Sequence, residues 1–290
     1  DSTIIERPTG YGGAVQIDGL ARIHCINCNF MNNRGRKGGA IYFDVDYSET
    51  NSYAGEFENC IFYGNSASEG GAIYGRSRSS LSFDDIGDAV PLNPQVSFRN
   101  VSFLSNEASL DGGAMHLEGI NVFVSDSRFE DNQATDRGGA MEMQNVWAGF
   151  NTGVSLSRNF AGNSGGALSL IASTLLEMDQ EFAVESEATQ TTIATATTGI
   201  VFSENVAENL GGAVLCSEGS MMLFLRAESV VFSNNECTLG SGGALAIVDY
   251  SARGNVTLIN AEFVGNRANN AAGAIYLDTN SGVDLITSSL

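Results

Sequence analysis

Apolar and polar residues alternate with a period of two in many short stretches of this chain. After each of a series of Gly-Gly-Ala units, the positions two and four residues beyond the second glycine are apolar, as in Val15-Gln16-Ile17 and Met141-Glu142-Met143. A period of two is typical of a β-strand with one buried face, and the stretches are too short for stable helices. The alternation therefore predicts an all-β protein built from short strands.

The Gly-Gly-Ala unit returns along most of the chain at intervals of 26 to 46 residues. Such spacing is typical of a solenoid with one coil per repeat, in which the longer intervals contain insertions. We expect insertions near 44–56, 76–95 and 171–198, and we expect partners to bind there because the coils themselves are used for packing. The second glycines of the units are Gly13, Gly39, Gly71, Gly113, Gly139, Gly166, Gly212, Gly243 and, in an Ala-Gly-Ala variant, Gly273.

A second motif, Phe-x-x-Asn, precedes every unit except the first, with Leu156 as an aliphatic variant. We expect the phenylalanines to stack inside the protein, and the asparagines to form a hydrogen-bonded ladder at a bend, where an asparagine backbone tolerates the left-handed region. A second polar column is expected three residues before the phenylalanine, at Asn27, Asn59, Asn100, Asp126 and Asn260. The predicted ladder consists of Asn33, Asn65, Asn106, Asn132, Asn159, Asn205, Asn235 and Asn266.

These repeats can satisfy their backbone hydrogen bonds if each coil pairs with the next at a spacing of about 4.8 Å. The sequence therefore predicts one domain over 1–290, a right-handed parallel β-helix of about nine to ten coils. The open end of a solenoid needs a cap, and neither terminus has residues typical of one. We accordingly expect the sequence to be a segment of a longer chain.

The composition is strongly acidic, with 34 acidic against 14 basic residues and a formal net charge of −20. This charge repels nucleic-acid phosphates and anionic lipid, so a nucleic-acid partner is not expected. The acidic residues predict a solvated surface, with weak Ca²⁺ binding at acidic loops as the functional alternative and no other cofactor. No apolar run reaches 18 residues, so no transmembrane segment is expected.

Cysteines and glycosylation motifs add two possible modifications. Cys28 and Cys60 occupy the same column in consecutive coils, at a spacing that suits either a disulfide or a stack of free thiols. The sequons at Asn100 and Asn255 could carry glycans if the protein is secreted from a eukaryote.

Candidate catalytic residues are sparse. The two histidines, His24 and His116, lie far apart in repeat phase, so neither a His-based triad nor a zinc site is expected. The repeat position just beyond the strand that follows the glycines is acidic in several repeats. Of these acids, only Asp18 and Asp44 belong to consecutive repeats. A solvated edge is favoured over a catalytic pair there, and the protein is not expected to be an enzyme. The acids at this repeat position are Asp18, Asp44, Glu118 and Asp278.

The combined motifs, as in "FYGNSASEGGAI" at 62–73, resemble the repeats of the chlamydial polymorphic outer membrane proteins over about 12–280. The resemblance implies a surface-exposed β-helical passenger domain with a role in adhesion. We therefore expect an extracellular or cell-surface scaffold without catalysis, whose outer faces and loops contact a protein or glycan partner or further domains of the same polypeptide. The alternative is a polysaccharide-active enzyme or a carbohydrate-binding module of the pectate-lyase-like class, with acids gathered on one face.

Overall fold

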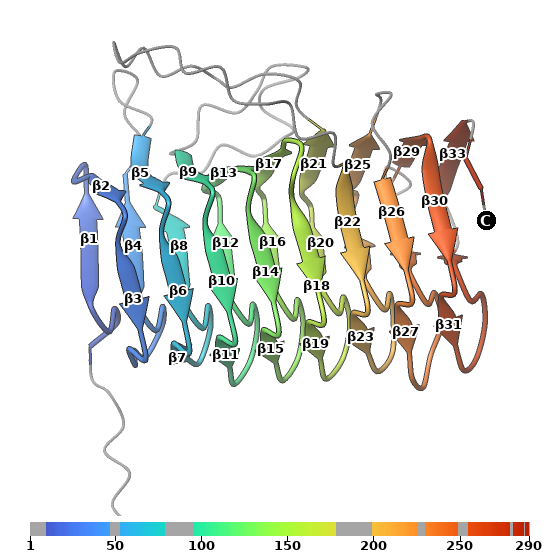
Figure 1. The fold of residues 1–290 in the computed structure, drawn as a ribbon, viewed down its shortest axis with the longest axis horizontal. Helices are drawn as coiled ribbons and strands as arrows, with labels where there is room; N and C mark the ends of the chain where they lie inside the picture. The colour runs from blue at the N-terminus through green and yellow to red at the C-terminus, as the bar shows by residue number, and fades with distance from the viewer. Residues whose placement is uncertain are drawn as a thin grey trace, which may run out of the picture.

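The computed structural model describes residues 10–46, 53–78, 95–177, 199–224, 230–248, 255–278, 281–286 and 288–289. All helical and strand elements in these residues are β-strands, and the chain winds into stacked coils whose strands pair in parallel with those of the next coil (Figure 1). The protein is therefore a parallel β-helix, and the predicted all-β solenoid is confirmed. The same residues contain no helix with the length and apolar character needed to cross a membrane.

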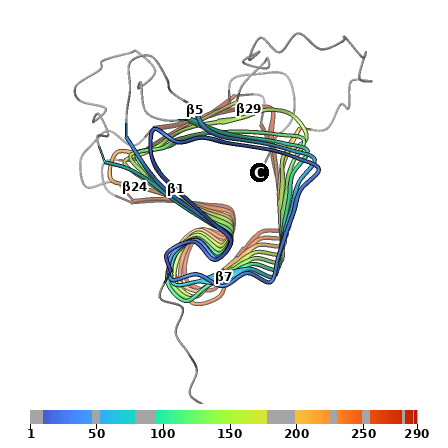
Figure 2. The same ribbon diagram turned by 90° about the vertical axis from the view of Figure 1, so that its left-hand side faces the viewer.

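Each complete coil contributes to four parallel sheets, which Figure 2 shows in a view along the stack. Sheet 1 follows the Gly-Gly-Ala units and contains β1 (Val15–Gly19), β4 (Ile41–Val45), β8 (Ile73–Ser77), β12 (Met115–Glu118), β16 (Met141–Gln144), β20 (Leu168–Ile171), β24 (Val214–Ser217), β28 (Leu245–Val248) and β32 (Ile275–Leu277). Sheet 2 contains β2 (Ile23–Ile26), β5 (Tyr53–Glu58), β9 (Gln95–Arg99), β13 (Asn121–Ser125), β17 (Trp147–Phe150), β21 (Thr174–Glu177), β25 (Met221–Phe224), β29 (Asn255–Ile259) and β33 (Gly282–Ile286).

The two remaining sheets contain the Phe-x-x-Asn motif and the residues that follow it. Sheet 3 contains β3 (Asn29–Met31), β6 (Ile61–Tyr63), β10 (Ser102–Leu104), β14 (Arg128–Glu130), β18 (Ser155–Ser157), β22 (Ile200–Ser203), β26 (Val230–Ser233) and β30 (Ala261–Val264). Sheet 4 contains β7 (Ser66–Ala67), β11 (Glu107–Ala108), β15 (Gln133–Ala134), β19 (Phe160–Ala161), β23 (Val206–Ala207), β27 (Glu236–Cys237) and β31 (Arg267–Ala268).

Equivalent residues of successive coils lie directly opposite one another, which places the phenylalanines in a column inside sheet 3. Phe103 pairs with Phe129, and Leu156 fills the position between Phe129 and Phe202. The rings of Phe103 and Phe129 stack with their centroids 4.7 Å apart, close to the spacing between neighbouring strands. The predicted aromatic stack is confirmed, and it fixes the register of one coil on the next.

The ladder asparagines are joined by hydrogen bonds from Asn33 to Asn266. The side-chain oxygen of Asn132, for example, accepts both the backbone N–H (3.0 Å) and the side-chain amide (2.9 Å) of Asn106. The Asn132 amide also donates to the carbonyl of Phe103 at 2.9 Å. The left-handed backbone conformation that an asparagine tolerates occurs at the residue before the ladder asparagine, as at Asp131 with φ 56°. A ladder asparagine instead keeps its backbone N–H directed at the next coil.

The two glycines of each corner have different roles. The first has a positive φ, as at Gly138 with φ 64°, which allows the chain to turn into sheet 1. The second lies against the backbone of the following coil, as Gly139 does against Gly166. The structure thus gives each glycine of the pair its own reason to lack a side chain.

The sequence patterns predicted short strands without showing the number per coil, and the structure has four in each complete coil. Sheet 2 follows sheet 1 at variable distances along the chain, because insertions separate the two strands in some coils, as between β4 and β5 and between β8 and β9. Sheet 4 strands have only two residues, too few for an alternation to be visible. The expected insertions at 44–56, 76–95 and 171–198 lie mostly outside the described residues, and strands β4, β5, β8, β9, β20 and β21 occupy their margins.

Candidate functional site

A column of buried side chains lies on the outer side of sheet 1, where the strand residues that point away from the core would normally meet solvent. Figure 2 shows the chain between sheet 4 and sheet 1 curling round before it enters the strand. The loop residues of this curl lie against the outward-pointing residues of β8, β12 and β16. We call the resulting cluster the polar slot, and it consists of Lys37, Glu69, Tyr74, Asp111, His116, Glu118, Arg137 and Glu142.

His116 occupies the centre of the polar slot. Its side chain is 3% exposed, and its ring stacks on that of Tyr74 with the centroids 5.1 Å apart. The Nε2 atom lies 3.0 Å from Oε1 of Glu118 on the same strand, and the Nδ1 atom lies 3.2 Å from Oε2 of Glu142 in the next coil. The imidazole therefore bridges two carboxylates that come from different coils.

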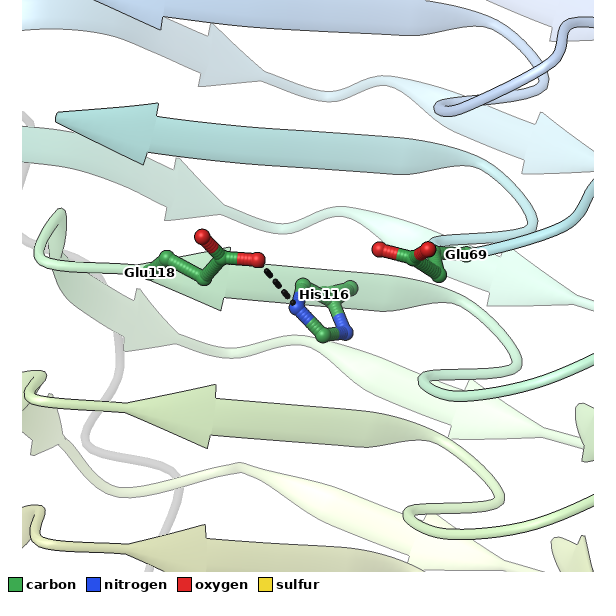
Figure 3. Close-up of side chains that lie close together, drawn as sticks. All are labelled: Glu69, His116 and Glu118. Carbon is green, nitrogen blue, oxygen red and sulfur yellow. Dashed lines mark hydrogen bonds and ion pairs between the residues drawn. The ribbon is translucent and has the colours of Figure 1, made fainter. Parts of the chain in front are cut away.

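A second carboxylate, Glu69, and a lysine, Lys37, also lie close to His116 and Glu118. Figure 3 places the imidazole of His116 between Glu118 and Glu69. The Tyr74 hydroxyl donates to Glu118 Oε1 at 2.7 Å, and Lys37 Nζ lies 2.7 Å from Glu69 Oε2. Lys37 also lies over the Tyr74 ring, 4.4 Å from its centroid. These two carboxylates are therefore already paired with a cation or a donor.

The Nδ1 side of the ring contains Asp111, Glu142 and Arg137. Arg137 Nη2 lies 3.1 Å from Glu142 Oε1, and its Nε lies 3.4 Å from Asp111 Oδ1. The backbone N–H of Arg137 donates to the same Asp111 oxygen at 3.1 Å. Glu142 is fully buried, and the amide of Gln144 donates to its Oε1 at 3.3 Å. This side holds two carboxylates against one permanent cation.

The charges of the polar slot shift several pKa values. Burial alone lowers the pKa of His116, but its contacts with Glu118 and Glu142 outweigh burial and raise that pKa to about 9. The hydrogen bond from His116 lowers the pKa of Glu118 to about 2. Burial, followed by the charge of Glu142, raises the pKa of Asp111 to about 6. At neutral pH, without a competing cation, His116 is therefore an imidazolium.

The pH dependence of stability follows from the His116 pKa. The pKa of His116 in the folded chain, about 9, lies above its ordinary value of 6.5, so the contribution of His116 to stability is fully present below about pH 6.5 and is lost as pH rises through 9. We expect the stability advantage of wild type over His116→Gln to fall by roughly 3 kcal/mol between pH 6 and pH 10. Urea unfolding of both proteins at each pH, in buffer with a chelator, measures this difference in stability.

The exposed histidine supplies the control for this measurement. His24 is 56% exposed and lies 3.8 Å from Glu56. His24→Gln should follow the pH profile of wild type. A parallel profile for His116→Gln would contradict the pairing of His116 with the two carboxylates.

Of the two neighbouring acids singled out in the sequence, Asp18 is exposed as expected, and Asp44 has a different environment. Asp18 and Asp44 are neighbours in register, but Asp44 is buried and not on a solvated edge. Arg76 and Arg78 each donate two hydrogen bonds to its carboxylate, and these bonds lower the pKa of Asp44 to about 2. The expectation of a solvated edge is therefore wrong at Asp44, which is a structural anchor for two arginines.

The possible modification sites are placed as follows. Cys28 and Cys60 lie in neighbouring coils with their thiols free, and the Cys28 N–H lies 3.4 Å from Cys60 Sγ, so the disulfide between them stays a prediction. Asn100 is exposed and donates through its side chain to Asn59 Oδ1 at 2.6 Å, within the second polar column. The side chain of Asn255 lies outside the described part of the chain.

Sequence reasoning missed the polar slot because it treated His116 as isolated. The outward positions of three consecutive coils, Tyr74, His116 and Glu142, share one repeat phase, and this was the available signal. Their burial was not predictable from that phase, since it depends on the loop that folds over them.

The stacked coils, the asparagine ladder and the aromatic column define a parallel β-helix repeat protein. The family model of the Chlamydia polymorphic membrane protein repeat matches residues 27–44, 59–76 and 199–217. The resemblance inferred from the motifs is thereby confirmed. The chain is also 27% identical over 226 residues to the probable outer membrane protein PmpG of Chlamydia muridarum.

The alignment with PmpG covers 62% of this chain and 22% of the relative, so the chain spans about a fifth of that protein's length. No solved structure matches the chain at a significant level.

Proposed function

We propose that this chain is an extracellular or cell-surface β-helix domain that acts as a structural or adhesive scaffold without catalysis. The observation that carries the proposal is that the repeated residues hold the coils together. The phenylalanines, ladder asparagines and corner glycines are all engaged in stacking one coil on the next. Binding is therefore left to the outer faces and the insertions. The similarity to an outer membrane protein supports the location.

The environment of the acidic residues favours a scaffold over a polysaccharide-active enzyme. Enzymes that cleave sugars need carboxylates that converge where a polysaccharide can reach them. The Asp44 carboxylate is held by two arginines, and Glu142, in the polar slot, is fully buried against Arg137. Neither carboxylate is available to a bound sugar.

The partner in this proposal is a protein or glycan at the cell surface, or further domains of the same polypeptide. The net charge of −20 favours a partner whose contacting surface is basic, because opposite charges accelerate encounter and like charges oppose it.

A binding assay tests the proposal. Beads coated with the chain are expected to attach to cultured mammalian cells or to components of a glycan array, and the soluble chain should compete. Replacing 178–198 with a short Gly-Ser linker is expected to reduce attachment at least fivefold if insertions carry the contact. Circular dichroism checks that the variant keeps its β structure.

Parallel incubation with acidic polysaccharides tests the alternative. Release of reducing ends or unsaturated products, abolished by Asp44→Asn or Glu142→Gln, would contradict the scaffold and favour the enzyme. Absence of attachment to every cell type and glycan would contradict adhesion.

A further inference from the structure

Two buried atoms at the centre of the polar slot lack hydrogen-bond partners. They are His116 Nδ1 and Glu142 Oε2, which have no hydrogen-bond partner among the described residues. They lie 3.2 Å apart, within the distance of an ion pair, but their geometry does not form a hydrogen bond. The two side chains are 3% and 0% exposed, so bulk water does not compensate them.

The other nitrogen of the ring determines which group His116 presents to Glu142. Nε2 lies 3.0 Å from Glu118, and Figure 3 shows this contact and the second ring nitrogen turned away from it. A carboxylate at Nε2 favours a proton on that nitrogen, which leaves a lone pair on Nδ1. This lone pair and Glu142 Oε2 would repel each other at 3.2 Å unless a positive charge lies between them. A proton supplies such a charge, and so does a metal ion.

We propose that the polar slot binds a divalent transition-metal ion of the Zn²⁺ type, with His116 Nδ1, Glu142 Oε2 and Asp111 as its ligands. Zn²⁺ lies about 2.0–2.2 Å from nitrogen and carboxylate ligands, which places two ligand atoms on one ion about 3–3.5 Å apart. The separation of 3.2 Å between His116 and Glu142 has this value. One oxygen of Asp111 lies within 4.8 Å of a ring nitrogen of His116 and of a carboxylate oxygen of Glu142, and on binding it would have to move closer to the ion.

The remaining residues of the polar slot suit a bound cation. Glu118 orients the imidazole through Nε2, the usual role of a carboxylate behind a metal-binding histidine. Arg137 contacts Glu142 Oε1 and Asp111 Oδ1, and so leaves Glu142 Oε2 for the ion. Four carboxylates face two permanent cations, Lys37 and Arg137, which gives a net charge of −2 when His116 is neutral. A divalent ion neutralises this charge, whereas a proton removes half of it.

A second trio of potential ligands consists of Glu69, His116 and Glu118. In this trio, His116 Nε2 already contacts Glu118, and Lys37 pairs with Glu69. Glu118 also accepts the Tyr74 hydroxyl. Since these groups already have partners, the geometry favours the Nδ1 side.

Calorimetric titration of the whole chain with ZnCl₂ tests the proposal. We expect one saturable site, and we expect His116→Gln and Glu142→Gln each to weaken binding at least tenfold. Glu118→Gln should weaken it by about 10- to 100-fold, because it orients the histidine without ligating the ion. Titration near pH 7 in two buffers of different ionisation enthalpy should show release of about one proton per ion, as the metal displaces the His116 proton.

Two variants serve as controls for other zinc ligands. His24→Gln removes the exposed histidine, and Cys28→Ser removes a half-buried thiol that lies next to Cys60. Both should bind Zn²⁺ like wild type. Circular dichroism in chelator establishes that each variant is folded, and Co²⁺ bound to wild type should give a spectrum without thiolate charge-transfer bands.

The proposal is overturned by the absence of a saturable site in wild type, or by unchanged binding in a folded His116→Gln variant. Loss of the site in Cys28→Ser, or thiolate bands in the Co²⁺ spectrum, would place the ion at the cysteines and overturn it as well. If His116→Gln does not fold, the Co²⁺ spectrum of wild type decides whether the ion lies at the cysteines.

Discussion

Gly139→Ala is expected to destabilise the β-helix by at least about 4 kcal/mol. A Cβ atom added to Gly139 would lie 2.1 Å from the carbonyl oxygen of Gly166 and 2.6 Å from that of Phe160. Both are backbone atoms of the next coil, held in place by the strand pairing on either side, so they cannot move away singly. Relief of the clash requires separating two coils along an entire corner. Urea unfolding followed by circular dichroism measures the change.

Gly10→Ala is the matched control, because its added Cβ would lie 3.7 Å from Gly12 O, an ordinary van der Waals distance. Its stability should be within about 0.5 kcal/mol of wild type. A Gly139→Ala variant as stable as this control would show that the coils do not approach each other closely at the glycine corner.

Asn132→Leu should also be strongly destabilising, by about 3–5 kcal/mol. The sequence alone suggests about 1–3 kcal/mol, the usual cost of leaving one buried polar group without its partner. In the structure, the leucine would remove the acceptor of the Asn106 N–H and amide and the donor to Phe103 O and Asn159 Oδ1. Several buried groups would lose partners together, and no water reaches them.

The neighbouring residue supplies the control for this substitution. Gln133 is exposed on β15, so Gln133→Leu should change stability by less than about 1 kcal/mol. Thermal and urea unfolding of both variants give the comparison. Equal stabilities for the two leucine variants would be incompatible with a buried ladder.

The ladder and the aromatic stack were predictable from the sequence for a simple physical reason. A parallel β-helix places the same position of every coil in the same environment, so the environment recurs as a residue type at a fixed phase. Phe129 and Asn132 could therefore be assigned to the interior and to the bend from their equivalents in other repeats. The four-sheet cross-section could not, because the sheet 4 strands are too short to show a pattern.

The polar slot was not predictable in the same way. With His24 and His116 far apart in phase, the sequence argued against a zinc site. That argument assumed more than one histidine ligand, whereas the proposed site combines one histidine with carboxylates from the loop before β12 and from β16. Asp111 and His116 are separated by only five residues, but Glu142 is brought to them by the stacking of coils.

The sequence by itself determined the repeat, its strands and the columns of stacked residues, since each recurs at the same phase in every coil. The folding of the loop over the outer side of sheet 1 was decided by the three-dimensional arrangement alone. This folding buries His116 and Glu142 and removes them from water, so that charges from separate coils must compensate one another. A side chain on the outer side of a sheet is buried only if another segment covers it. The local residue pattern of the strand does not indicate whether such a segment is present.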